Sequence, residues 1–82
     1  MEKRIGAALI LVTDRTVTSR LNEIISRFSH IIIGRQGVPL LDKGVGVITL
    51  IFEGTTDEIG ALTGQIGKLD GIQVKSASMK SV

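Results

Sequence analysis

The chain has 82 residues and a formal net charge of +2, it is 43% hydrophobic, and it contains no Cys. This length makes one domain over residues 1–82, and the lack of Cys excludes disulfides, thiolate nucleophiles, thiolate-bound zinc and all-Cys iron–sulfur clusters. The basic residues are scattered and form no stripe, so we expect no direct binding to nucleic acid.

The first apolar stretch covers residues 5–12 and shows no alternation of apolar and polar residues. Such a stretch predicts a strand that is buried on both faces. It is far shorter than the roughly 20 residues that cross a bilayer. No small-residue cleavage motif follows it, which argues against a secretory signal. We therefore expect a cytoplasmic protein without membrane contact.

A helix is predicted after Asp14, whose carboxylate can accept hydrogen bonds from the free N–H groups of the first turn. Apolar side chains then recur at helical spacing and form one stripe. This stripe consists of Val17, Leu21, Ile24, Ile25 and Phe28. His30 follows, and we expect it at the helix C-terminus, where the helix dipole favours a cation. Because it is the only His, it could join a metal site only where symmetry brings copies together, and this alternative stays open.

The apolar run at residues 31–33 predicts a second strand, and the segment at residues 34–39 is predicted to be a shaped loop. Two glycines and a proline favour turns in that segment. Arg35 carries a planar guanidinium that suits carboxylates or phosphates. Two interpretations stay open, namely a turn with a solvated or ion-paired Arg, and a loop that recognises an anion or a partner at a subunit interface.

A third apolar run at residues 45–52 predicts another strand that is apolar on both faces, and a second helix follows it. Thr55 and Glu58 have the spacing of a capping box, which starts a helix. The apolar stripe of this helix consists of Ile59, Leu62, Ile66 and Leu69.

Three glycines, Gly60, Gly64 and Gly67, lie along one line of the second helix. Each interior glycine costs about 1 kcal/mol relative to Ala. We therefore expect close packing on this line, against the sheet or a neighbouring subunit, with a ligand on exposed backbone as the alternative. Gly71 is expected to end the helix as a left-handed cap.

The last strand starts at Ile72, and its apolar positions change phase after Ser76, which predicts a bulge or a strand that leaves the sheet. The chain thus reads as strand, helix, strand, twice, with the halves offset by 41 positions. This order predicts an α+β fold of the ferredoxin-like, ACT-like βαββαβ type, a four-stranded antiparallel sheet with two helices on one face. The strands at 5–12 and 45–52 should be central. Their second apolar face then lacks a cover, and we expect a second copy of the chain to supply it in a sheet-to-sheet dimer.

Side chains for catalysis are missing from the pattern. The chain has no nucleophile supported by a base and no clustered carboxylate pair. We therefore expect no enzyme, no catalytic residue, no cofactor and no metal site within one chain.

Three glycine-containing motifs together resemble the iron-only hydrogenase system regulator family over nearly the whole chain. They are Ile33-Gly34-Arg35-x-Gly37-Val38-Pro39, Lys43-Gly44-Val45 and the pattern of residues 59–75. That family resembles ACT domains and the C-terminal domain of the nickel-responsive repressor. The resemblance implies an ACT-like domain, a dimer or tetramer, and a regulatory role linked to the hydrogenase system. The nickel ligands of the repressor, several His and a Cys, have no counterparts here, so we carry over no nickel site. No DNA-binding segment precedes residue 5, so any regulation of transcription would act through a protein partner.

We therefore predict a regulatory, ligand-sensing module that responds to a small ligand or protein partner at a subunit interface. The residues expected to form the site are Gly34, Arg35, Gly37, Pro39 and Asp14. Arg35 would contact the anion, the glycines and Pro39 would shape the loop, and Asp14 would lie at the neighbouring strand–helix turn. The alternative is a purely structural oligomerisation module without a small-molecule ligand.

Overall fold

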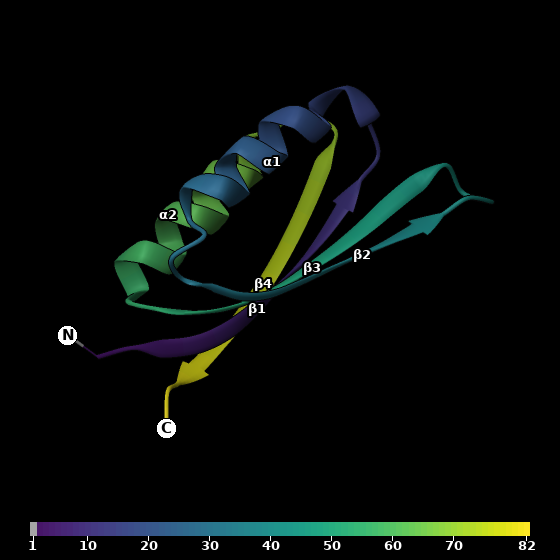
Figure 1. The fold of residues 1–82 in the computed structure, drawn as a ribbon. Coiled ribbons are helices and arrows are strands. Elements are labelled where there is room, and N and C mark those ends of the chain that lie inside the picture. The colour runs from purple at the N-terminus through teal and green to yellow at the C-terminus, as the bar shows by residue number, and fades with distance from the viewer. Residues whose placement is uncertain (1) are drawn as a thin grey trace.

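A computed structural model describes residues 2–82 and contains four strands and two α-helices in the order βαββαβ. The strands are β1 (Arg4–Val12), β2 (Ile32–Leu40), β3 (Val45–Gly54) and β4 (Ile72–Lys80). The helices are α1 (Thr18–Arg27), preceded by the short 3₁₀ turn η1 (Arg15–Val17), and α2 (Thr56–Gly67). The strands lie in the order β2-β3-β1-β4 with antiparallel neighbours, and both helices cover one face of the sheet (Figure 1). The predicted fold and its two central strands are confirmed.

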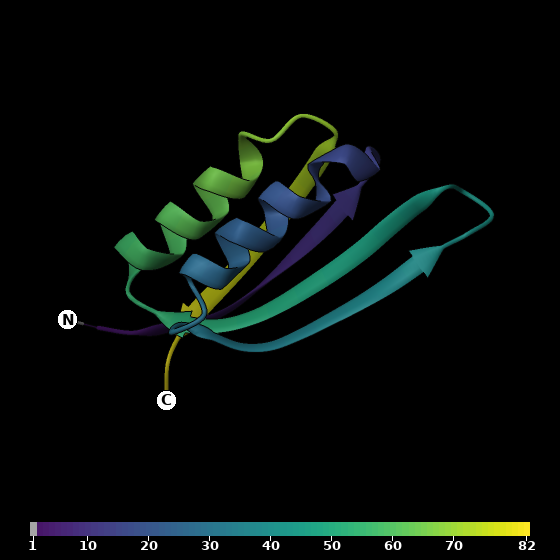
Figure 2. The ribbon, with the colours of Figure 1, turned by 45° about the horizontal axis from the view of Figure 1, so that its top comes forward.

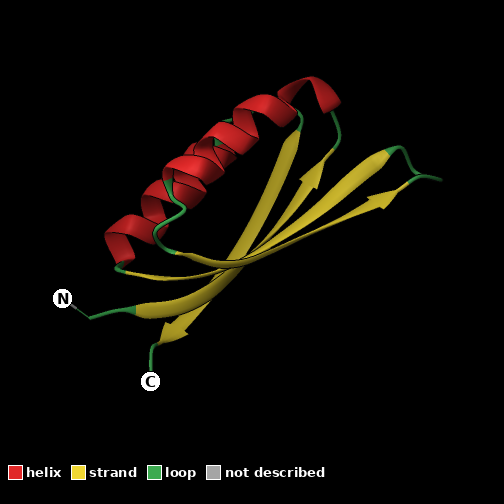
Figure 3. Ribbon diagram, viewed as in Figure 1, coloured by secondary structure: helices red, strands yellow, loops and turns green. Residues whose placement is uncertain are grey.

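The core lies between the helix layer and the sheet layer, which Figure 3 shows in separate colours. Both predicted helix stripes face the sheet. The side chains that they bury most fully are Leu21, Ile24, Ile25, Ile59, Leu62 and Ile66. The side chains that the central strands bury against the helices are Ala8, Ile10, Val12, Leu50 and Phe52. Both halves of the predicted capping box are formed, because the Thr55 hydroxyl accepts from the Glu58 N–H and the Glu58 carboxylate accepts from the Thr55 N–H.

The segment at residues 34–39 is a strand, so the loop predicted there is wrong. Residues 32–40 pair with β3 along their whole length, with one register shift between Ile32 and Gly34. Strand β2 is an edge strand, and an edge strand tolerates Pro39 and glycines because only one of its sides needs hydrogen bonds. The turn of the hairpin follows at residues 41–44, where Gly44 has a positive φ of 67°.

The last strand runs straight, so the bulge or departure predicted after Ser76 is also wrong. Strand β4 pairs with β1 in one unbroken register from Ile72 to Lys80. Its later apolar residues, Ala77 and Met79, simply occupy the face away from the helices. On the helix side, Phe52 fills the space over Gly6 instead, because a Cβ atom on Gly6 would stand only 2.7 Å from the Phe52 ring.

The glycines of α2 differ from the prediction as well. The helix ends at Gly67, and Gly71 takes its left-handed φ of 76° four residues later, at the turn into β4. A Cβ atom on Gly60 or Gly64 would meet no other atom within 4 Å, whereas one on Gly67 would lie 3.6 Å from Val74 on β4. The sheet therefore packs on this line only at Gly67. Packing by a neighbouring subunit stays a prediction.

The sheet face away from the helices, which we call the open face, carries exposed apolar side chains on three strands, with Thr49 and Lys75 on either side of Leu9. Strand β1 alternates buried and exposed side chains although its sequence is apolar from Ile5 to Val12. Leu9 on β1 is 52% exposed, and Ile51 on β3 is 50% exposed. Met79 on β4 adds a third large apolar side chain to this face, at 69% exposure. The surplus apolar face expected from the sequence is therefore present.

The hairpin of β2 and β3 extends past the helices on one side of the molecule (Figure 2). The end of this hairpin lies beside the turn that leads from β1 into α1, because Val12 and Pro39 both pair with Gly46. This projection is what leaves room for a cleft on the helix side of the sheet. Neither helix between residues 2 and 82 is long and apolar enough to cross a membrane.

Candidate functional site

The predicted site residues lie on two faces of the sheet and one turn. Gly34 pairs with Ile51, so it lies on the open face beside the register shift of β2. Arg35, Gly37 and Pro39 lie on the opposite, helix side of the same strand, since they pair with Leu50, Ile48 and Gly46. Asp14 lies in the turn between β1 and η1. Within one chain, the structure therefore does not bring these five residues together in one cluster.

Arg35 ties the edge strand to a helix. Its Nη2 donates a hydrogen bond to Oδ1 of Asn22 on α1, at 2.8 Å. This contact crosses from β2 to α1 and holds the helix-facing side of the hairpin in place. It uses one of the five N–H donors of the guanidinium, so the side chain can still donate hydrogen bonds to an anion bound at the sheet edge.

Asp14 caps the 3₁₀ turn, as the sequence predicted for the start of the first helix. Its Oδ1 accepts hydrogen bonds from the Thr16 N–H at 2.9 Å and from the Thr16 hydroxyl at 2.7 Å. The bond from the Thr16 side chain, followed by the bond from the Thr16 backbone, lowers the pKa of the Asp14 carboxyl. Gly71 packs directly against this residue, and a Cβ atom there would collide with the Asp14 side chain. The position of Asp14 is thus set by local folding.

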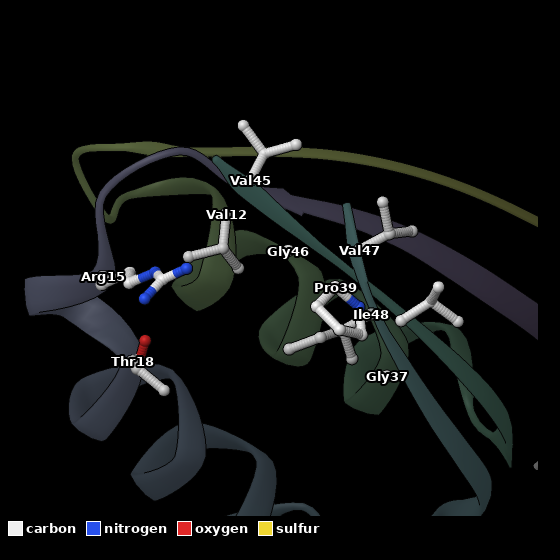
Figure 4. Close-up of a pocket in the computed structure, with 10 residues that line it drawn as sticks. Val12, Arg15, Thr18, Gly37, Pro39, Val45, Gly46, Val47 and Ile48 are labelled. Atoms are coloured by element: carbon white, nitrogen blue, oxygen red, sulfur yellow. The ribbon is translucent and has the colours of Figure 1, made fainter. Parts of the chain in front are cut away.

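Gly37 and Pro39 line a cleft of about 330 Å³ between the projecting hairpin and the start of α1, which we call the hairpin cleft. The strands supply most of its lining, namely Val12, Gly37, Val38, Pro39, Val45, Gly46, Val47 and Ile48. The side chains of Val38, Val45 and Val47 alternate to the open face, so Val12, Pro39 and Ile48 supply the apolar side chains on the helix side. Of the side chains that the structure describes, only Arg15 and Thr18 add polar groups to this lining. Figure 4 shows these two on one side of the cleft and Pro39 with Gly37 on the other. The cleft therefore combines an apolar surface with a single cation and a single hydroxyl.

Sequence reasoning missed Arg15 and Thr18, although a signal for them was available. The predicted hairpin order already places the end of β1 beside the start of β3. Residues that follow β1 directly must then lie near Gly46 and its neighbour on β2. Arg15 comes three residues after Val12, and Val12 pairs with Gly46. The strand order alone could therefore have placed Arg15 close to the end of the hairpin.

His30 pairs with a carboxylate on the other helix, not with the end of its own. Its Nε2 lies 3.3 Å from Oε2 of Glu58, and its ring stacks on Phe28 with 6.4 Å between ring centroids. The pKa of Glu58 is lowered, first by the hydrogen bond from the Thr55 backbone and less by the His30 contact. Within residues 2–82, no group of three or more His, Cys, Asp or Glu side chains is arranged to hold a metal ion.

These observations define a ferredoxin-like α+β domain with an uncovered apolar sheet face and a small cleft beside its hairpin. Residues 4–76 match the TM1266-like family, which is described as "Iron-only hydrogenase system regulator, putative". The chain belongs to this family, as its resemblance in sequence predicted. No curated protein matches the chain.

Solved structures agree with this assignment. The uncharacterized protein TM1266 from Thermotoga maritima is 32% identical, with a TM-score of 0.90 over 96% of this chain and 100% of that one. CPII from Thiomonas intermedia K12, a nitrogen regulatory PII-like protein solved with ADP, AMP and bicarbonate bound, is 12% identical. Its TM-score is 0.60 over 100% of both chains. The de novo designed protein Foldit4 is 18% identical, with a TM-score of 0.59 over 99% of this chain and 100% of that one. The last two likenesses show the fold alone.

Proposed function

We propose that this protein is a non-enzymatic regulatory module that acts as a homo-oligomer and responds to a small ligand or a protein partner. Membership of a regulator family supports the regulatory role. The binding of ADP, AMP and bicarbonate by CPII supports a ligand response, since that protein shares the fold.

The exposed apolar side chains of the open face carry the proposal of a homo-oligomer. Leu9, Ile51 and Met79 are each at least half exposed there, on three different strands. Four strands about 4.8 Å apart, of nine or ten residues at about 3.3 Å each, give a face of about 19 by 30 Å. The projected area of roughly 570 Å² approaches the roughly 800 Å² that each partner buries in a standard interface. A second copy stacked on this face would therefore complete a β-sandwich of ordinary size.

The test is the mass of the protein in solution, measured by light scattering over a range of concentrations. The wild type should contain two or more chains. Leu9→Lys places like charges opposite each other at the centre of the stacked faces and should give a single folded chain. Leu41→Lys is the matched control, because Leu41 is 79% exposed and lies in the hairpin turn. A wild type that stays a single chain at high concentration, or a Leu9→Lys variant with unchanged mass, would contradict the proposal.

The ligand response is tested separately by a thermal-shift screen of amino acids, nucleotides and metal ions. A compound that binds only the folded protein stabilises it by about 2.7 kcal/mol at one hundred times its dissociation constant. Arg35→Ala tests whether Arg35 contacts the ligand, as the sequence predicts, or only Asn22. If no compound raises the melting temperature, the alternative of a structural oligomerisation module is favoured.

A further inference from the structure

We propose that the hairpin cleft binds a small organic acid, whose carboxylate pairs with Arg15 and Thr18 and whose apolar body lies on the strands. This inference rests on the ligand response proposed above and names the chemical class of that ligand. Four observations carry it: the charge of the lining, the size of the cleft, the two glycines that keep it open, and its position at the start of α1.

The charge of the lining selects an anion. Among residues 2–82, Arg15 is the only charged side chain that lines the cleft, and none of the carboxylates described lines it. A guanidinium presents a planar fork of donors that matches a carboxylate. Figure 4 shows the Arg15 guanidinium reaching into the space between α1 and the hairpin, with the Thr18 hydroxyl turned toward it. One anionic group would therefore meet a cation and a hydroxyl donor together.

A second hollow on the same end of the molecule shows the contrast. It is lined by the carboxylates of Asp14 and Asp70 and by the cations of Arg20 and Lys68. These charges balance, and Asp14 is already committed to the hydrogen bonds from Thr16. The hairpin cleft has no such internal counterion, so an external anion is the group that fits it.

The size of the cleft limits the ligand to a small molecule. Its volume is about 330 Å³, and a water molecule takes about 30 Å³ in the liquid. The cleft therefore holds roughly ten non-hydrogen atoms, at the lower end of the range for ligand pockets. A short branched or aromatic carboxylic acid fits this volume, whereas a whole nucleotide is too large to be enclosed.

Two glycines leave the apolar floor open. A Cβ atom on Gly37 would meet no other atom within 4 Å, and one on Gly46 would reach only Val12 Cβ, at 4.0 Å. Neither glycine has a positive φ, so backbone geometry does not require glycine at either position. Larger side chains would project into the cleft and fill it. The ligand could then no longer contact the apolar side chains of Val12, Ile48 and Pro39.

The start of α1 supplies the hydroxyl of the proposed site. Val17 occupies the N-cap position and its side chain makes no capping hydrogen bond. Thr18, the first residue of the helix, lines the cleft. The backbone N–H groups of Val17 and Thr18 already donate to the carbonyls of Asp14 and Arg15, so the Thr18 hydroxyl is the donor that α1 offers to the proposed carboxylate.

The experiment is a titration of ¹⁵N-labelled full-length protein followed by NMR, with 4-methylpentanoate as the probe. The amides of Gly37 and Gly46 report on the cleft, and those of Gly60 and Gly64 on the distant face of α2. An acid of this size should bind with a dissociation constant on the order of 1 mM. We expect saturable shifts at Gly37 and Gly46 and none at the α2 glycines. The neutral analogue 4-methylpentanamide should bind roughly tenfold more weakly, because it lacks the charge.

Three variants separate the proposed site from a general effect of charge. Arg15→Gln should weaken binding of the probe roughly tenfold, and Gly37→Val should abolish it by filling the cleft. Arg20→Gln removes the same charge from the second hollow and should bind as the wild type does. No saturable shift at Gly37 and Gly46, or equal affinity in Arg15→Gln and the wild type, would overturn the proposal.

The two proposals fail in different ways. Light scattering on the same samples tests the oligomer without reference to the probe. Stabilisation by another class of compound in the thermal-shift screen, with no response to the carboxylate, would keep the regulatory function and overturn the organic-acid site.

Discussion

The outer face of α2 offers the sharpest test of how this chain uses its glycines. Gly60 and Gly64 lie in the interior of a twelve-residue helix, and added Cβ atoms would meet nothing within 4 Å. Glycine at an exposed interior helix position costs about 0.5–1 kcal/mol relative to Ala. The double variant Gly60→Ala/Gly64→Ala should therefore raise the free energy of unfolding by about 1–2 kcal/mol. For a domain of this length, about 1 kcal/mol raises the melting temperature by about 4–8 °C.

Thermal and urea unfolding followed by far-UV circular dichroism measures this gain. Gly71→Ala is the control with the opposite sign, because Gly71 has a φ of 76° and its Cβ atom would collide with Asp14. A double variant that is no more stable than the wild type would refute the reasoning. It would mean that a neighbouring subunit covers this face in solution, which is the alternative that the sequence left open.

Three further perturbations test the packing of the core, the N-cap of α2 and the loss of stability at acidic pH. Gly6→Ala should destabilise the protein by about 1–3 kcal/mol, because the new Cβ atom would stand 2.7 Å from both the Phe52 ring and the backbone oxygen of Ala77; unchanged urea unfolding would contradict this expectation. Thr55→Ala should cost about 1 kcal/mol and Thr55→Ser much less, and equal losses would mean that the hydroxyl is not what caps α2. The pKa values of Asp14 and Glu58 are lowered in the folded protein, so their contribution is complete above the unfolded pKa values of about 4 and is lost as the pH falls through the folded ones. The free energy of unfolding, measured from neutral to acidic pH, should therefore fall below about pH 4. The double variant Asp14→Asn/Glu58→Gln should show a smaller fall, and a fall equal to that of the wild type would contradict this prediction.

The parts of the fold that follow from local patterns could be predicted from the sequence. Apolar residues at helical spacing located both helices, and Thr55 with Glu58 marked the start of α2. The two continuous apolar runs marked the central strands. The offset of 41 positions relates the two helices correctly, since Leu21 and Leu62 are both fully buried. It fails in the strands, where it matches Leu9 with the fully buried Leu50, because one added residue moves a strand side chain to the other face.

The edge strands were harder to predict because only one side of an edge strand is constrained. Glycines and Pro39 in β2 look like a loop in isolation, and only pairing with β3 makes them a strand. The phase change in β4 looks like a bulge for a similar reason. Its apolar residues do not mark the core, since Met79 lies on the open face. Apolar patterns in a sequence indicate which residues are buried. In these edge strands, burial depends on the neighbouring strand and on whether another molecule covers the open face.

The candidate site was predicted only in part, since its residues come from two distant segments. Gly37 and Pro39 were expected from their own segment, whereas Arg15 becomes a site residue only when the hairpin folds beside the end of β1. Arg35 drew attention because of its charge, yet its contact with Asn22 explains its position in the fold. Charge near a glycine-rich segment is thus a weaker guide to this site than the register of the sheet.

The hairpin places the two proposed surfaces on opposite sides of the same two strands. Val38 and Val47 face the open side, while Gly37 and Ile48 alternate with them toward the helices. A ligand in the cleft and a second copy on the open face would therefore both restrict the hairpin. Where a ligand binds the oligomer more tightly than the single chain, it must strengthen assembly by the same factor. The ligand affinity of the cleft and the oligomeric state of the protein are thus linked. Such a module would regulate by changing its oligomeric state when the ligand binds.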